Sequence, residues 1–223
     1  GFDPRGIALL SITSDADEST SPRRTNVVDE VLDQIAAVPG VQAASAAPWA
    51  VMEGSRWTDQ IILPGQPPSE RSELFYPIAP NYFKTMGIRL LQGRDFRAGE
   101  SQDAPVIPTI VNMAFVRSYL HSNDPAAALN QPFQHPEGPK RKDHRIVGIA
   151  GDTLYSDLRE AAAPMVYIPI GSATGFSLHV RSTLDSATLA RLVARDLPAG
   201  VRLKEMTTLE TLIGDTLLRE RLL

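Results

Sequence analysis

The sequence VDEVLDQIAAVPGVQAASAA, residues 28–47, decides how this chain folds. Apolar residues recur in it at the i, i+3, i+4 and i+7 spacing of one helix face, namely at Val28, Val31, Leu32 and Ile35. We therefore expect a helix from about Arg23 to Val38, ended by Pro39-Gly40. Val41 to Ala47 then predicts a strand, and Ile7 to Thr13 predicts an earlier, mostly buried strand. Together these segments form a strand–helix–strand unit.

A second unit of the same kind lies near the C-terminus. Phe176 to Arg181 alternates apolar and polar residues, which predicts a half-buried strand. Its inward side chains would be Phe176, Leu178 and Val180. Asp185 or Ser186 is expected to cap the helix that follows. One face of that helix carries Leu189, Leu192, Val193 and Leu197. Val201 to Glu205 is expected to be the closing strand of the unit.

The two units end their helices in similar ways, at Val38-Pro39-Gly40-Val41 and at Leu197-Pro198-Ala199-Gly200-Val201. We interpret them as a degenerate internal repeat, and two such units commonly share one sheet, as in ferredoxin-like folds. Residues 97–171, which contain further short strands and a helix, are expected to form a second, smaller α+β lobe. The predicted fold class is therefore α+β with two lobes. The first lobe would comprise residues 1–96 and 172–223, with the second inserted into it.

Both ends of the sequence suggest a piece of a longer protein. Thr207 and Glu210 have the spacing of a capping box, which opens a helix expected from about Thr208 to Leu223. Its apolar face would be Leu209, Leu212, Ile213 and Leu217. No helix-ending residue follows, and the chain begins abruptly at Gly1-Phe2. We therefore expect an excised part of something larger.

The composition is that of an ordinary globular protein. The 223 residues are 43% hydrophobic and 22% charged, with a formal net charge of -4. This acidic balance argues against a nucleic-acid-binding domain, which usually carries a basic face. The chain contains no cysteine, so disulfides, thiolate metal sites and a cysteine nucleophile are excluded. No apolar run reaches the roughly 18 residues that a membrane-spanning helix needs.

Motifs of catalysis and of cofactor or metal binding are missing from the sequence. His121, His135, His144 and His179 show no HxH or HExxH spacing. We expect surface histidines, with His179 on the outward face of its strand and the others in loops. The sequence has no GxSxG elbow, no SxxK pair and no P-loop. No catalytic, cofactor-binding or metal-binding residue is therefore predicted, and the chain is not expected to be an enzyme.

A few charged and aromatic residues have sequence surroundings that allow more than one role. Asp152 follows an apolar strand, where a carboxylate can be catalytic, but without a partner acid or base we expect it to cap a turn. The basic run Lys140 to Arg145 could contact phospholipid head groups or an acidic partner, although we favour a solvated hairpin tip. Trp49 and Trp57 could pack in the core or form an exposed contact patch, and periodicity does not decide between these.

A series of short segments, taken in order, resembles one known family, the extracytoplasmic core domain of MacB/FtsX-type ABC transporter permeases. The likeness covers nearly the whole chain and is greatest to the ATPase-less permeases abundant in acidobacteria. Its segments are Gly1 to Pro4, Val38 to Val41, Ile78 to Ile88, Leu91 to Phe96, Ile110 to Asn112, Ile146 to Asp152, Pro164 to Pro169 and Met206 to Glu210. Each is a weak signal alone, whereas the ordered set is specific.

The same segments have structural roles on physical grounds. Gly87 and Gly93 suit positive φ at a helix end and a turn. Arg94 and Asp95 could pair or cap the turn locally. Asn112 is expected to cap a helix from Met113 to Leu120. These are motifs of the fold and not of catalysis.

The resemblance implies a place in the cell and a set of partners. It implies a periplasmic domain of an inner-membrane permease, joined to flanking transmembrane helices, with a porter-like first lobe and a Sabre-like inserted lobe. The permease would act as a dimer with a second copy and would depend on a separate cytoplasmic ATPase subunit. A periplasmic adaptor and an outer-membrane channel are further implied partners, as in efflux by MacB. The domain would transmit ATP-driven helix motion.

Two other functions remain open at this point. A stand-alone periplasmic sensor or small-ligand-binding module would need a deep, apolar pocket of about 300 Å³ or more. A hydrolase would need several titratable groups converging in one cleft. If the chain is a permease domain, we expect neither such a pocket nor such a cleft. We then expect both chain ends to lie side by side at one end of an elongated body.

Overall fold

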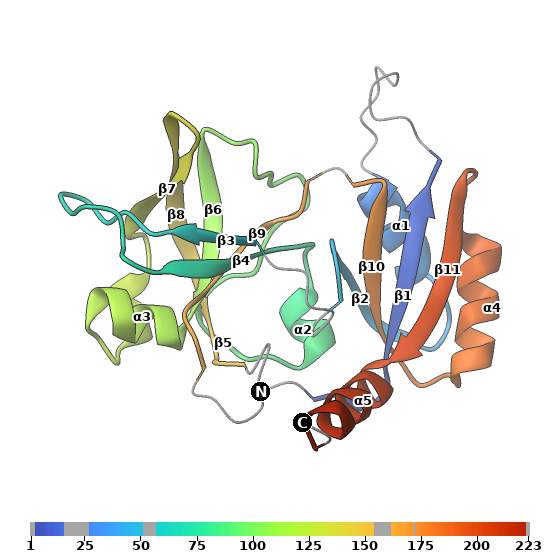
Figure 1. The fold of residues 1–223 in the computed structure, drawn as a ribbon. Coiled ribbons are helices and arrows are strands. Elements are labelled where there is room, and N and C mark those ends of the chain that lie inside the picture. Colours follow the sequence, from blue (N-terminus) through green and yellow to red (C-terminus); the bar gives the residue numbers. More distant parts are fainter. Residues whose placement is uncertain (1–2, 16–26, 51–56, 154–161, 172, 222–223) are drawn as a thin grey trace.

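The computed structural model of the chain describes residues 3–15, 27–50, 57–153, 162–171 and 173–221 (Figure 1). The elements, in chain order, are β1 (Ile7–Ser14), α1 (Val27–Ala36), β2 (Val41–Ala47), β3 (Trp57–Gln60), β4 (Ser72–Ile78), α2 (Tyr82–Met86), β5 (Leu90–Gly93), β6 (Val106–Asn112), α3 (Met113–Leu120), the 3₁₀ turn η1 (Pro125–Ala128), β7 (Pro132–Glu137), β8 (Lys140–Ala150), β9 (Met165–Pro169), β10 (Gly175–Ser182), α4 (Ser186–Asp196), β11 (Val201–Thr208) and α5 (Leu209–Arg221). Strands in mixed sheets with few helices confirm the α+β class.

The two repeat units share one antiparallel sheet with the strand order β11-β1-β10-β2. Strand β10 lies between β1 and β2 and is antiparallel to both, so β1 and β2 run parallel without touching. This is the ferredoxin-like arrangement of two split β-α-β units that the sequence predicts. Helices α1 and α4 pack on one face of the sheet, where Val28, Val31, Ile35, Leu189 and Val193 are buried.

The second sheet has the order β3-β4-β9-β6-β8-β5, with β7 paired to β8. It mixes parallel pairs, such as β4 with β9, and antiparallel pairs, such as β5 with β8. Helix α3 covers one of its faces, and Phe115, Val116, Phe133 and Ile149 are buried there. In Figure 1 this sheet forms the left half of the molecule and the ferredoxin-like sheet the right half.

The border between the two sheets does not fall at residue 97, where the sequence analysis placed the lobe boundary. Strands β3, β4 and β5 precede that residue yet pair with β9 and β8. Short apolar runs indicate a strand but not its distant partner, so local patterns alone do not place this boundary. The two-lobe division itself stays a prediction. If the lobes are divided according to the sheet that each strand joins, the inserted lobe would begin at about residue 57, where β3 starts.

A shared core joins the two sheets. Ile7 and Leu9 of β1 belong to the same buried cluster as Ile78 of β4 and Tyr167 of β9. Helix α2 lies between the sheets and contributes Tyr82, Phe83 and Met86, all buried, to this cluster. Both faces of β1 are therefore covered, because its alternate residues Ala8, Leu10 and Ile12 face α1 and α4.

Local sequence explains where several elements end. Gly87 ends α2 in the left-handed conformation, with φ of 70°, as expected. Gly93 has φ of 76°, and a Cβ there would lie 2.3 Å from the backbone oxygen of Val147, so only glycine fits. The expected capping box of Thr207 and Glu210 is wrong by one residue. The hydroxyl of Thr208 caps α5 instead, by accepting from the amide of Thr211 at 3.1 Å. Strand β11 ends at Thr208, so Thr207 still belongs to the strand and does not occupy the cap position.

Asn112 holds three segments together. As expected, its side-chain oxygen caps α3 by accepting from the amide of Phe115 at 3.0 Å. The same oxygen accepts from the amide of Met165 in β9 at 3.0 Å, and its side-chain nitrogen donates to the backbone oxygen of Ala163 at 2.8 Å. The residue is completely buried, so its bonds to Phe115 and Met165 are formed away from water, whereas the bond to Ala163 is partly exposed.

We predict that Asn112→Ala destabilises the chain by about 2–4 kcal/mol, because it removes a helix cap and leaves buried backbone groups unpaired. The free energy of unfolding in urea measures the effect. Asn123→Ala, at an exposed position in the next loop, is the control and should change stability by less than about 0.5 kcal/mol. Equal effects for the two variants would contradict this role of Asn112.

Candidate functional site

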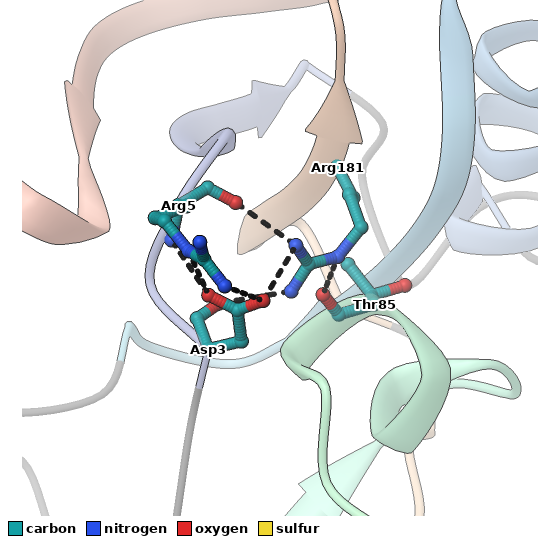
Figure 2. A network of polar contacts seen from close by, with 4 residues as sticks. All are labelled: Asp3, Arg5, Thr85 and Arg181. Carbon is teal, nitrogen blue, oxygen red and sulfur yellow. Dashed lines mark hydrogen bonds and ion pairs between the residues drawn. The ribbon is translucent and has the colours of Figure 1, made fainter.

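A cluster around Arg181 ties the start of the chain to the centre of the molecule (Figure 2). The guanidinium group donates three hydrogen bonds of 2.9 Å, to the backbone oxygens of Asp3, Arg5 and Thr85. The carboxylate of Asp3 lies 3.9 Å from the same guanidinium. Residues Asp3 and Arg5 precede β1, Thr85 belongs to α2, and Arg181 lies at the end of β10. We call these four residues the Arg181 clamp.

The clamp is well suited to a guanidinium group. Its planar fork carries N–H donors on three nitrogens and can therefore bond to several carbonyl oxygens at once. The ammonium group of a lysine donates from a single nitrogen and would reach fewer of them. The Arg181 side chain is 18% exposed, so these charge-assisted bonds are largely shielded from water. Asp3 is held further by its amide, which donates to the backbone oxygen of Met86 at 3.1 Å. The segment before β1 is thus fastened to both β10 and α2.

Arg5 completes the cluster by pairing with Asp3. Its Nε lies 3.0 Å from Asp3 Oδ1, and its side chain is 82% exposed. Hydrogen bonding from Arg5, with a smaller contribution from the charge of Arg181, lowers the pKa of Asp3 below its usual value. Because this pair faces solvent, its contribution to stability is small. The buried part of the clamp is the guanidinium of Arg181.

The chain enters and leaves the ferredoxin-like sheet at the same place. Ala8 of β1 pairs with Thr208, the last residue of β11 before α5 begins. Arg5 is close enough to Glu210 in the first turn of α5 for their charges to interact. The described N-terminal segment and the start of α5 therefore lie side by side, at the lower edge of the view in Figure 1.

The expectation of four surface histidines is wrong for three of them. His179 is completely buried, because the face of β10 that was expected to meet water is covered by α2. Its ring packs edge-on against Tyr82, with 5.5 Å between ring centroids. His179 Nδ1 is buried without a hydrogen-bond partner, and burial lowers the pKa of this histidine to about 3. His121 is exposed, at the left-handed end of α3.

His135 and His144 lie on strands β7 and β8 and not in loops. Nδ1 of His135 and Nε2 of His144 are 2.6 Å apart, and Nδ1 of His144 lies 2.7 Å from the hydroxyl of Thr109. Both histidines are buried, at 4% and 1% exposure. Burial, assisted by the nearby charges of His135 and Lys142, lowers the pKa of His144 to about 3. This pair has no signature in the sequence, because a separation of nine residues matches no motif.

Asp152 caps a helix, although not the local turn that was expected. Its Oδ1 accepts from the amide of Ala114 in the first turn of α3 at 2.7 Å. Its Oδ2 accepts from Arg117 at 2.5 Å. A carboxylate at a helix N-terminus also interacts favourably with the helix dipole. This position accounts for Asp152 without a catalytic role.

The other residues for which the sequence left several roles open are engaged in packing, in an ion pair or in the start of a strand. Trp49 accepts a 2.7 Å hydrogen bond at its backbone oxygen from Tyr76, and Trp57 packs on Phe75 with 5.0 Å between ring centroids. Both tryptophans are thus packed against core aromatics. Arg94 pairs with Glu100 at 2.6 Å instead of with its neighbour. The basic run Lys140–Arg145 begins β8 just after the turn of the β7–β8 hairpin, as expected for the base of a hairpin tip.

Asp95 supports the turn after β5. It accepts hydrogen bonds from the amides of Phe96 at 2.7 Å and Asn81 at 3.0 Å. Burial raises the pKa of its carboxyl group, although these two amides act in the opposite direction. The carboxylate thus connects the turn to the residue that opens α2.

The hollows of the surface are lined by mixed polar and apolar groups. One of about 460 Å³ lies between α1, β2 and α2 and is lined in part by Asp29, Asp33 and Lys84. Another of about 400 Å³ lies beside the β7–β8 hairpin. Across the described ranges, no three histidine, cysteine, aspartate or glutamate side chains are grouped so as to hold a metal ion. Nor does any helix in those ranges have the length and apolarity to cross a bilayer.

These features define an α+β domain in which a second sheet interrupts a ferredoxin-like sheet. No family model and no curated protein matches the sequence. Solved structures do match. The periplasmic region of MacB from Actinobacillus actinomycetemcomitans is 14% identical with a TM-score of 0.58, over 96% of this chain and 94% of that chain. The extracellular domain of the ABC-type transporter YknZ from Gram-positive bacteria is 10% identical with a TM-score of 0.53, over 88% of this chain and 100% of that one. The chain therefore has the MacB-like fold that the sequence resemblance implied.

We predict that Arg181→Met destabilises the chain by about 2 kcal/mol, because three backbone oxygens lose a charged donor. Hydrogen exchange of the Asp3 amide should also become faster, since the segment before β1 loses its attachment. The control is Arg191→Met, which removes an exposed arginine of α4. Unchanged exchange at Asp3 in Arg181→Met would show that the clamp does not hold this segment.

We also predict that acid destabilises the fold through its buried histidines. In the unfolded chain an imidazole takes up a proton below about pH 6.5. In the folded chain His144 and His179 stay neutral down to a pKa of about 3. Their stabilising contribution is thus complete above about pH 6.5 and is lost between that value and about pH 3. At about pH 5 the expected loss is roughly 1–2 kcal/mol for each histidine.

The test compares urea unfolding of His179→Phe and of the unchanged chain at about pH 7.5 and pH 5. The variant keeps a ring against Tyr82 but cannot titrate, so its stability should fall less with acidification. His121→Asn, at the exposed histidine, is the control for replacing a histidine that is not buried. If His179→Phe has the same pH dependence as the unchanged chain, His179 is not one of the groups responsible.

Proposed function

We propose that this chain is the extracytoplasmic domain of an ABC transporter permease and that it transmits motion from flanking membrane helices. The observation that carries the proposal is the likeness of fold to the MacB and YknZ domains over most of each chain. The position of the chain's entry beside the start of α5 supports it, because a domain driven through two helices needs both attachments at one end.

The Arg181 clamp gives the proposal a mechanical element. A displacement of the segment Asp3–Arg5 would pull on β10 and α2 together, since one guanidinium group bonds to all three. Helix α2 is part of the core between the sheets, so the displacement would reach the second sheet as well. Packed cores resist continuous deformation, so a displacement of the N-terminal segment relative to α5 would rotate the two packed sheets together as one body.

The implied partners follow from the same proposal. The permease would depend on a separate cytoplasmic ATPase subunit and would pair with a second copy of itself in the inner membrane. This domain would lie in the periplasm, in reach of an adaptor and an outer-membrane channel. It would do no chemistry of its own. Asp152 and the buried histidines support that view. Asp152 caps a helix and the histidines pack in the interior.

Cross-linking in the full-length permease tests the proposal. These 223 residues contain no cysteine, so Arg5→Cys and Glu210→Cys are the two thiols of this domain, and a short bismaleimide joins them once any cysteine elsewhere in the permease has been replaced by serine. This link would prevent the N-terminal segment from moving relative to α5. We expect ATP-driven transport to fall at least about tenfold, a change that corresponds to roughly 1.4 kcal/mol in the barrier of the rate-limiting step.

The control is a link at the opposite ends of β1 and β11, the two strands next to Arg5 and Glu210. Asp15 and Arg202 lie 2.5 Å apart there as an ion pair. Cross-linking Asp15→Cys to Arg202→Cys should leave transport unchanged, because that end has no attachment to a membrane helix in the proposal. Full transport with the Arg5–Glu210 link in place would refute transmission by relative movement of the two ends.

A further inference from the structure

The hollow beside the β7–β8 hairpin has features of a binding site that the proposed function does not use. Its volume is about 400 Å³, within the range of small-molecule sites. It is lined by residues from β3, from the loop before β6, and from the hairpin. The residues that matter for its chemistry are Trp57, Asp59, Asp103, His135, Glu137 and Lys142.

His135 presents a hydrogen-bond acceptor to this hollow. The Thr109 hydroxyl lies 3.1 Å from the backbone oxygen of Ile107 and 2.7 Å from Nδ1 of His144, and we assign the tautomer in which it donates to the carbonyl and accepts from Nδ1–H of His144. Nε2 of His144 is then unprotonated and accepts from Nδ1–H of His135. A neutral imidazole carries one proton, which leaves Nε2 of His135 as an acceptor.

The second nitrogen of His135 has no protein partner in the described structure. The residue is 96% buried, since only 4% of it is exposed, and it lines the hollow. Nδ1 points to His144, and the two ring nitrogens point in widely different directions, so Nε2 is directed away from that pair. Nε2 is thus the ring atom through which His135 can bond a molecule in the hollow.

The charges around the hollow favour a cation. Three carboxylates line it, from Asp59, Asp103 and Glu137, against one ammonium group. That ammonium, on Lys142, lies 3.7 Å from Glu137. The carboxylates of Asp59 and Asp103 are thus in excess. Trp57 adds an aromatic ring, which attracts cations by its quadrupole.

We infer that this hollow binds an organic cation, a guanidinium or primary ammonium group, with Asp59 and Trp57 holding the charge and Nε2 of His135 accepting a hydrogen bond from it. A metal ion fits less well, because the described residues form no group of three ligands. An anion would meet the excess of carboxylates. The cation could be a free amine or the side chain of a protein partner, and both offer the same donors.

Titration of the 223-residue chain with arginine capped at both ends tests the inference. We expect a Kd of about 10 mM or tighter, with NMR shifts at the Trp57 indole and the His135 ring. Capped citrulline is the matched probe, since it has nearly the same shape without the charge, and it should bind at least about tenfold more weakly. Agmatine and an arginine-containing peptide are run beside them, and the tighter of the two identifies the source of the cation.

Two variants locate the site. Asp59→Asn removes one charge at constant size and should weaken binding of capped arginine at least about tenfold. Asp33→Asn makes the same change of net charge on α1, in the other half of the molecule, and should leave binding unchanged. No shift at Trp57 or His135, equal binding of citrulline, or equal loss in both variants would each overturn the inference. Tighter binding of Zn²⁺ than of capped arginine at His135 would also overturn it.

Discussion

An aromatic layer between the two sheets holds this fold together. Tyr76 of β4, Tyr82 and Phe83 of α2, and Tyr167 of β9 pack in successive contacts, with ring centroids 5.7, 5.9 and 4.9 Å apart for the pairs 76–82, 82–83 and 83–167. Tyr82 also meets His179 of β10, in the other sheet. Helix α2 has only five residues and could not be stable alone. Its burial between the sheets stabilises the helix, and its aromatic residues in turn fix the sheets to each other.

Elements determined by nearby residues could be predicted from the sequence. The helices α1 and α4 follow from their apolar spacing, and α3 follows from Asn112 as its cap. The ferredoxin-like sheet was predictable because the repeat indicated two units of one kind. The second sheet was not, since pairing of β4 with β9 joins residues about 90 positions apart. The alternation of apolar and polar residues in β10 predicted that one face of this strand is exposed to solvent. Helix α2, from a distant part of the chain, covers that face.

The candidate sites were harder to predict than the fold. The partners of Arg181 are backbone oxygens, which every residue possesses, so no motif records the clamp. The pair of His135 and His144 depends on the register of the β7–β8 hairpin, which places His144 opposite Phe133 and brings its ring to that of His135. Asp152 bonds to an amide 38 residues away, and Arg94 forms its ion pair with Glu100, 6 residues away, in addition to a bond to the backbone oxygen of Asp95. In each case the residue type was visible in the sequence, whereas its surroundings depended on tertiary structure.

The antiparallel pairing of β2 with β10 has a consequence for how such a molecule can be divided. Ala47 lies opposite Ser177, so the chain leaves the ferredoxin-like sheet and returns to it at adjacent points. A short hairpin turn could therefore replace everything between them and restore an uninterrupted β-α-β-β-α-β chain. Such a miniature would expose the face of β1 that carries Ile7 and Leu9, which is buried in the shared core. Grafted sheets in other proteins meet the same demand: the host must offer neighbouring strand ends, and its newly covered face must become apolar.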